Sequence, residues 1–154
     1  MQVRDIMHTD VKVTSPQDTF EQVAVALHDN RISSVVVMDG ANLSGIVTER
    51  DLVNLVAEGG NPKTTKVGER MTRDLDTVGP RTDIAEAADH MARLKIRHLP
   101  VLEDGELIGI ISIRDLTDWA VHELTAGHEL PDLERSHAAL RSAVEVNKQA
   151  GREA

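Results

Sequence analysis

The sequence has no cysteine, no tyrosine, and only one tryptophan and one phenylalanine among its 154 residues. Without cysteine the chain can form no disulfide, no thiolate nucleophile and no cysteine-ligated zinc site. Its core must therefore be built almost entirely from aliphatic side chains. No stretch approaches the roughly 18 consecutive apolar residues of a membrane span, and the first ten residues lack the apolar segment of a secretory signal. These absences predict a reduced, soluble protein of the cytoplasm.

Basic residues are scarce relative to acidic ones. Lysine and arginine number 17 against 26 aspartates and glutamates, which gives a formal net charge of −9. Because nucleic-acid binding depends on neutralising phosphates with lysine and arginine, this balance argues against a nucleic-acid partner. Seven histidines are present, but none has the close spacing of a metal-binding motif, so we expect no metal site.

The chain contains an internal repeat. When the sequence is shifted by 64 positions, residues 3–52 align without a gap with residues 67–116, with 13 identities where chance gives roughly three. The identical positions of the first copy are Val3, Met7, Asp10, Pro16, Ala24, Ile32, Val37, Leu43, Gly45, Ile46, Arg50, Asp51 and Leu52. The repeat predicts one unit at 1–64, a second at 65–124 and a tail at 125–154.

Both repeats predict the same order of elements, β-α-β-β-α, in a mixed α/β (α+β) fold. Two β-rich runs flank polar turns at 39–42 and 103–106, which is typical of hairpins. The segment 58–66 contains two glycines and one proline and predicts the linker between the repeats. The first helix of each repeat is predicted by an apolar stripe at helical spacing, Phe20, Val23, Ala24 and Leu27 in one copy and Ile84, Ala87, Ala88 and Met91 in the other.

The starts of these first helices also carry a signal. Thr19 with Gln22, and Asp83 with Glu86, have the spacing of a capping box or a close variant of it. In the tail, heptad spacing of Leu130, Leu133, His137, Leu140, Val144 and Asn147 leaves two interpretations open, a frayed surface helix or a helix packed across a dimer partner. The last seven residues have a composition typical of disorder.

The best-matched segment of the repeat suggests chemistry. Residues 45–51 (GIVTERD) and 109–115 (GIISIRD) share the form G-h-h-[ST]-x-R-D at the junction of a strand and a helix. A helix N-terminus presents unpaired N–H groups and the positive end of the helix dipole, which suit a phosphate. A nearby hydroxyl (Thr48 or Ser112) can bind the same phosphate, and a carboxylate three residues on (Asp51 or Asp115) can accept from both hydroxyls of a ribose. The glycine permits close approach of a ligand or of another backbone.

The same spacing has a purely structural interpretation. The pattern [ST]-x-x-[DE] is a capping box, and Thr48 with Asp51 would satisfy it without any ligand. Recurrence of the segment at a fixed offset, after a glycine-led strand and with an arginine before the aspartate, favours the ligand.

With these motifs the chain resembles a tandem pair of CBS (cystathionine β-synthase) domains, a Bateman module. The openings R-D-I-M and G-E-R-M, the strand at 96–101 and the two G-h-x-[ST]-x-x-D signatures carry the resemblance over about residues 1–124. It implies two β-α-β-β-α domains related by pseudo-two-fold symmetry. It also implies two ligand sites in clefts between the domains, for adenosyl compounds such as AMP, ADP, ATP, S-adenosylmethionine or NAD(H).

The resemblance implies roles for particular residues. Asp51 and Asp115 would hold ribose hydroxyls, and Thr48 and Ser112 phosphate. Each site would also take the start of the central strand from the other domain, where Arg97 and His98 in one copy correspond to Ser33 and Ser34 in the other. We therefore expect the Asp51 cleft to favour the more highly phosphorylated or tighter ligand and the Asp115 cleft to bind weakly or stay empty. The other candidate ligand-binding residues are the signature positions Ile46, Ile110, Arg50 and Arg114.

We thus predict a regulatory module, not an enzyme, with no catalytic residues and no obligatory cofactor. Its adenine nucleotide would act on a homodimer or on an unidentified protein partner. Two rival hypotheses remain. An enzyme acting on a bound nucleotide would need a base or a metal near the phosphate. A ligand-free dimerisation or stress-associated protein would use the two signatures only as helix caps.

Overall fold

The computed structural model describes residues 1–125 and 141–142. The chain divides into two compact units. One, here called the repeat-1 unit, is Asp10–Asp76. The other, the repeat-2 unit, joins Met1–Thr9 to the chain from Thr77 onward. Beyond Thr125 only 141–142 are described, so the predicted tail helix lies outside the described residues.

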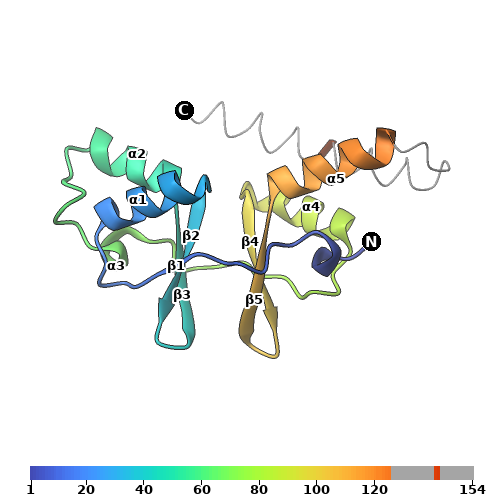
Figure 1. The fold of residues 1–154 in the computed structure, drawn as a ribbon, viewed down its shortest axis with the longest axis horizontal. Helices are drawn as coiled ribbons and strands as arrows, with labels where there is room; N and C mark the ends of the chain where they lie inside the picture. Colours follow the sequence, from blue (N-terminus) through green and yellow to red (C-terminus); the bar gives the residue numbers. More distant parts are fainter. Residues whose placement is uncertain (126–140, 143–154) are drawn as a thin grey trace. The chain divides into compact units, whose positions relative to one another are not determined.

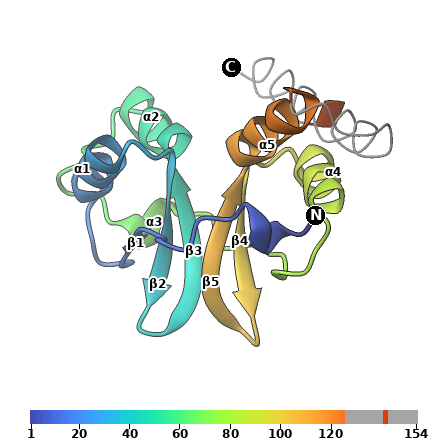
Figure 2. The ribbon, with the colours of Figure 1, turned by 45° about the vertical axis from the view of Figure 1, so that its right-hand side comes forward.

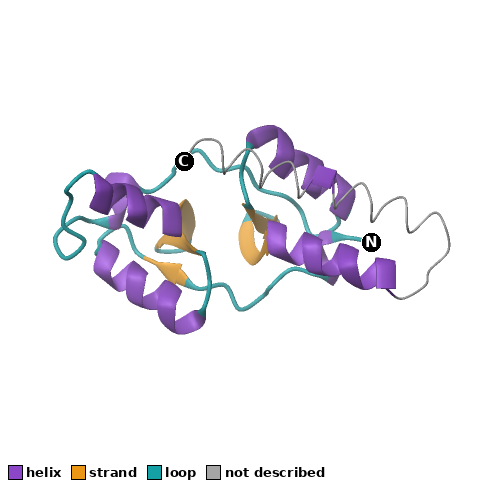
Figure 3. Ribbon diagram, turned by 90° about the horizontal axis from the view of Figure 1, so that it is seen from above, coloured by secondary structure: helices purple, strands orange, loops and turns teal. Residues whose placement is uncertain are grey.

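The repeat-1 unit is a three-stranded sheet with helices packed against it (Figure 1). Strand β2 lies in the middle, parallel to β1 and antiparallel to β3. Helices α1 and α2 contact each other and the sheet, and Figure 3 shows them lying together. The elements are β1 (Val13–Thr14), α1 (Phe20–Asn30), β2 (Ser34–Asp39), β3 (Asn42–Thr48), α2 (Glu49–Ala57) and α3 (Val67–Arg70).

The repeat-2 unit has the same plan, except that its sheet has two strands and the segment equivalent to β1 forms only a single bridge, between Val78 and Val101. Strands β4 and β5 form an antiparallel pair, and α4 and α5 contact each other. The elements are η1 (Val3–Asp5), α4 (Ile84–Leu94), β4 (His98–Glu103), β5 (Glu106–Ser112) and α5 (Ile113–Thr125). The offset of 64 residues holds to the residue for both ends of α1 and α4, β2 and β4, and β3 and β5. The predicted fold class, two β-α-β-β-α units, is confirmed.

The short opening segment of each repeat pairs with the sheet of the other repeat, and the two segments are here called the exchanged opening segments. In the repeat-2 unit, His8 forms a bridge with Ile110, and in the repeat-1 unit Thr72 forms the equivalent bridge with Ile46. Figure 2 shows the first residues of the chain, in dark blue, beside β4 and β5. Residues 1–9 thus pair with the sheet of the second repeat through a single bridge, although they precede the first repeat in the sequence.

The segment 58–66, predicted as the linker, is bound into the repeat-1 unit. The carbonyls of Pro62 and Thr65 accept hydrogen bonds of 3.0 and 3.1 Å from the backbone N–H groups of Glu21 and Phe20, at the start of α1. The chain therefore passes between the units at Thr9/Asp10 and at Asp76/Thr77.

The first helices bury the stripes that predicted them. Phe20, Val23 and Leu27 of α1 are buried, as are Ile84, Ala87, Ala88 and Met91 of α4, and each set belongs to the hydrophobic cluster of its own unit. Thr19 and Gln22 form the predicted capping box, with the Thr19 N–H donating to Gln22 Oε1 at 2.8 Å. At α4 the variant occurs instead, because Asp83 caps the Ala85 N–H at 2.9 Å. Among the described helices, none is long and apolar enough to cross a membrane.

Candidate functional site

Each signature lies where a strand turns directly into a helix. Strand β3 ends at Thr48 and α2 begins at Glu49, while β5 ends at Ser112 and α5 begins at Ile113. Thr48 has extended backbone angles, φ −121° and ψ 168°, as the residue before a helix must. The change from strand to helix angles within one residue places the signature hydroxyl and carboxylate together at the helix N-terminus.

In the first copy, the Asp51 side chain caps the N-terminus of α2. Its Oδ2 atom accepts a hydrogen bond of 2.7 Å from the Thr48 N–H and one of 2.9 Å from the Thr48 hydroxyl. The capping interpretation is therefore correct as a description of the local structure. Both contacts use Oδ2, and Oδ1 takes no part in the cap.

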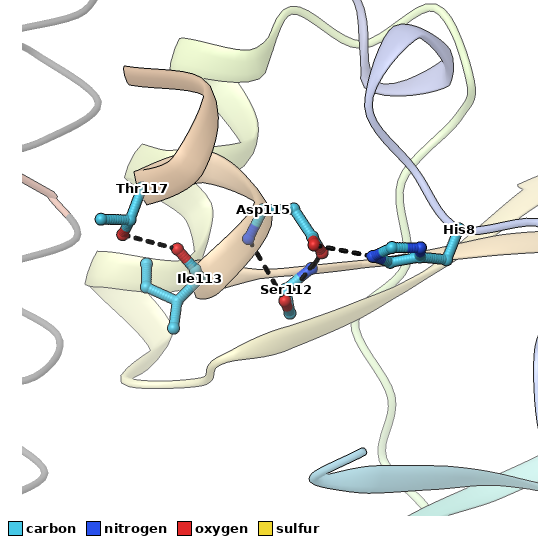
Figure 4. Close-up of polar contacts among 5 residues, drawn as sticks. All are labelled: His8, Ser112, Ile113, Asp115 and Thr117. Carbon is cyan, nitrogen blue, oxygen red and sulfur yellow. Dashed lines mark hydrogen bonds and ion pairs between the residues drawn. The ribbon is translucent and has the colours of Figure 1, made fainter. Parts of the chain in front are cut away.

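In the second copy, the carboxylate of Asp115 makes the same contacts and one more (Figure 4). Its Oδ2 atom accepts from the Ser112 N–H and from the Ser112 hydroxyl, both at 2.7 Å. Its Oδ1 atom lies 2.8 Å from Nε2 of His8. The Asp115 side chain is only 10% exposed, whereas that of His8 is 68% exposed. A largely buried carboxylate is thus held from both sides.

The basic and hydroxyl residues at the start of the central strands lie beside the signature of their own repeat. His98 is the cross-strand partner of Ser112, and Ser34 is that of Thr48. The carbonyl of Arg97 accepts the Ile113 N–H at 2.9 Å, as the carbonyl of Ser33 accepts the Glu49 N–H at 3.0 Å. Arg97 and His98 are therefore brought together with Ser112 and Asp115, and Ser33 and Ser34 with Thr48 and Asp51.

His98 has an unusual electrostatic environment. Burial lowers the pKa of His98 to about 4, the positive charge of Arg97 acts in the same direction, and the carboxylate of Asp115 opposes them. His98 is therefore neutral at pH 7 and offers a hydrogen-bonding ring rather than a charge.

The remaining predicted site residues lie close to the junctions. Ile46 is buried and Ile110 is half-buried, and both pair through their backbones with the exchanged opening segments. Arg50 and Arg114, in the first turns of α2 and α5, are exposed. The arginines therefore lie at the helix N-termini, where an anion would approach.

The space beside each signature glycine is occupied by the backbone of an exchanged opening segment. A Cβ atom at Gly45 would lie 2.8 Å from the carbonyl oxygen of Thr72, and one at Gly109 would lie 3.1 Å from that of His8. Of the two uses considered for these glycines, close approach of the exchanged segment is the one the structure shows.

Sequence reasoning missed the part that His8 plays at the second signature. The only sign of this difference in the sequence is that His8 aligns with a threonine, Thr72, at the offset of 64. A shallow pocket of about 360 Å³ also opens beside Asp115, lined by Ile6, Asp115, Asp118, Trp119 and His122. Trp119 belongs to the hydrophobic cluster of the repeat-2 unit and is 8% exposed. Within the described ranges, no group of three or more histidine and carboxylate side chains is placed to hold a metal ion.

Comparison with known proteins identifies the family. Residues 3–58 and 67–122 each match the CBS domain. The chain therefore belongs to the CBS domain family and carries two copies of the domain.

Its relatives include stand-alone proteins of similar size. The CBS domain-containing protein YhcV of Bacillus subtilis is 28% identical over 131 residues, covering 85% of this chain and 94% of YhcV. The CBS-domain containing protein ATU1752 of Agrobacterium tumefaciens matches with a TM-score of 0.73 at 33% identity, over 77% of this chain and 98% of that one. The CBS domain protein PAE2072 of Pyrobaculum aerophilum, solved in complex with AMP, matches with a TM-score of 0.70 at 27% identity, over 75% of this chain and 90% of its own.

Proposed function

We propose that this protein is a regulatory module that reversibly binds an adenine nucleoside ligand at its two signature junctions. The observation that carries the proposal is the half-buried carboxylate at the N-terminus of α2, which uses only Oδ2 for its cap. Oδ1 of Asp51 is then the acceptor for a ribose hydroxyl. The complex of the related PAE2072 protein with AMP supports this ligand class.

The phosphate side of the site follows from the same geometry. The Thr48 hydroxyl donates to Asp51 at 2.9 Å, and rotation about its Cα–Cβ bond would redirect it to a phosphate oxygen. The backbone N–H groups of the first turn of α2, and the exposed Arg50, supply further donors to an anion. Ribose and phosphate are thereby bound by groups only three residues apart.

The two sites would not prefer the same ligand, because the residues at the start of the central strands differ in charge between the repeats. Arg97 carries a positive charge that favours a more highly phosphorylated ligand, whereas its counterpart Ser33 is neutral. The next residue also differs, because His98 of the second repeat is equivalent to Ser34 of the first. AMP, ADP, ATP, S-adenosylmethionine and NAD(H) all contain the adenosine group, so the choice among them depends on these side chains.

The role of the bound ligand is regulation rather than catalysis. A ligand acts as a switch only when it binds one conformation more tightly than another, and the state that it selects would be recognised by a second copy or by a protein partner. A cytoplasmic homodimer is part of this proposal. The competing hypothesis, a ligand-free structural protein, predicts that both signatures serve only as caps.

A thermal-shift panel tests the proposal. The protein is unfolded, refolded to remove co-purified nucleotide, and heated with AMP, ADP, ATP, S-adenosylmethionine or NADH. A ligand at ~100 times its Kd adds about 2.7 kcal/mol to the free energy of unfolding, which raises Tm by several degrees. The shift should fall in Asp51→Ala or Asp115→Ala.

A matched control is Asp18→Ala. Asp18 holds a turn in the repeat-1 unit by accepting the Ser15 N–H at 2.7 Å and the Thr14 hydroxyl at 2.8 Å, and it belongs to neither signature. This variant should lose stability but keep the full ligand shift. Absence of a shift with every ligand would support the structural hypothesis.

A further inference from the structure

The two signature carboxylates are not in the same state. Asp115 has both oxygens occupied, Oδ2 by Ser112 and Oδ1 by His8. Asp51 has only Oδ2 engaged in its cap. Among the described side chains, no hydrogen bond joins Asp51 to Thr72, which stands where His8 stands in the other unit.

The equivalence of His8 and Thr72 is set by their backbones. The His8 N–H donates to the Ile110 carbonyl and the Ile110 N–H donates back to the His8 carbonyl, both at 2.9 Å. Thr72 exchanges the same two bonds with Ile46, both at 3.0 Å. The two side chains therefore leave the same point of the same bridge, and they differ only in chemistry: an imidazole reaches the carboxylate, and the short threonine side chain makes no such bond.

We propose that His8 is a built-in competitor of the ribose at Asp115, so that this site binds an adenine nucleoside more weakly than the Asp51 site. The inference rests on the proposed function. The imidazole holds the carboxylate oxygen that a ribose hydroxyl would use, and the ligand must displace it. Displacement is feasible because His8 is 68% exposed and can turn into water, whereas Asp115 is 10% exposed and stays in place.

This device acts on the Asp115 site only. It gives the two signatures different affinities although their motifs match. The expected difference due to His8 is about tenfold in Kd, because one hydrogen bond must be broken before the ribose can bind.

Reciprocal exchange of the two residues provides the test. In Asp51→Ala, only the Asp115 site remains to bind AMP. In Asp115→Ala, only the Asp51 site remains. In the first background His8→Thr is added, and in the second Thr72→His. Both positions are exposed, so neither change disturbs a core. AMP binding to each protein is measured by isothermal titration calorimetry.

The expected result is reciprocal. His8→Thr should tighten AMP binding at the Asp115 site about tenfold, and Thr72→His should weaken binding at the Asp51 site. In the wild-type protein, saturating AMP should also move the imidazole resonances of His8 in an NMR spectrum, as the ring leaves Asp115.

Other outcomes overturn the inference in distinguishable ways. If the wild-type protein binds AMP but His8→Thr leaves the affinity unchanged, His8 does not compete. If His8→Thr weakens binding, His8 contacts the ligand directly, and the inference is again wrong. If the wild type binds neither AMP nor any other ligand of the thermal-shift panel, the proposed function fails, and the role of His8 fails with it.

Discussion

The hydroxyl of Ser112 lies 2.7 Å from Oδ2 of Asp115, so the two side chains that would bind phosphate and ribose are bound to each other. Thr48 and Asp51 have the same relationship at 2.9 Å. A cap and a ligand site are therefore not alternatives at these junctions. The cap uses Oδ2 and holds the carboxylate in position, and the ligand would use Oδ1. The effects of a substitution on stability and on binding can therefore be measured separately.

Replacement of either aspartate should lower stability before any ligand is added. Asp51→Ala removes the acceptor for the Thr48 N–H and hydroxyl, and loss of such a cap costs about 1 kcal/mol. Asp51→Asn keeps one carbonyl oxygen as an acceptor and should cost less. Urea unfolding of the ligand-free variants measures both values. Equal stability of Asp51→Ala and the wild type would show that the cap contributes nothing.

The signature glycines should resist substitution even by alanine. A Cβ at Gly45 would lie 2.8 Å from both Met71 Sδ and the Thr72 carbonyl oxygen, and the latter is fixed by its bridge to Ile46. Overpacking of this kind costs about 1–3 kcal/mol. Gly45→Ala should therefore lower the urea midpoint.

Gly79→Ala is the matched control for this substitution. The nearest atom to its Cβ would be Thr82 Oγ1 at 3.9 Å, an ordinary contact. Gly79→Ala should leave the midpoint nearly unchanged. A similar loss in both variants would mean that the glycines matter for another reason than the approach of the exchanged segment.

Much of this architecture was predictable from the sequence because it is local or periodic. The helices with their apolar stripes and the Thr19 cap follow from residues close together in the chain, and the two similar units follow from the repeat at an offset of 64 residues. The pairing of His8 with Asp115 spans 107 positions. It depends on which sheet receives the opening segment, and backbone bridges to Ile110 or to Ile46 use the same N–H and carbonyl groups. Local patterns could not decide between them.

Stability should decline in mild acid because of His98. Its pKa is about 4 in the folded protein, against 6.5 for a histidine in the unfolded chain. Between these values the unfolded chain binds a proton that the folded protein does not, so stability falls as the pH falls through this window. From pH 7.5 to pH 5 the loss is about 2 kcal/mol.

The contribution of His98 is isolated by comparison of variants. His98→Gln should show a smaller loss between pH 7.5 and pH 5 than the wild type. The control is His28→Gln, because the His28 side chain is 87% exposed and stays in water in both states. If the wild type and His98→Gln lose the same stability on acidification, the burial of His98 is not the cause.

Pro100 should account for the difference between the two sheets. In the repeat-1 unit, the Val36 N–H donates to the Lys12 carbonyl at 3.1 Å and β1 pairs with β2 over two residues. Position 100 is equivalent to position 36, and proline has no N–H to donate. The segment of the second repeat that is equivalent to β1 accordingly forms only a single bridge, between Val78 and Val101.

Two substitutions test this account in opposite directions. Pro100→Val restores the donor, and its new amide should be protected from hydrogen exchange by a bond to the Asp76 carbonyl, the counterpart of Lys12. Val36→Pro removes the donor from a buried position and should lower the free energy of unfolding by about 1–3 kcal/mol, because the Lys12 carbonyl loses its hydrogen bond. Rapid exchange of the amide at position 100 in Pro100→Val would show that the segment before Val78 is kept from pairing by something other than the missing N–H.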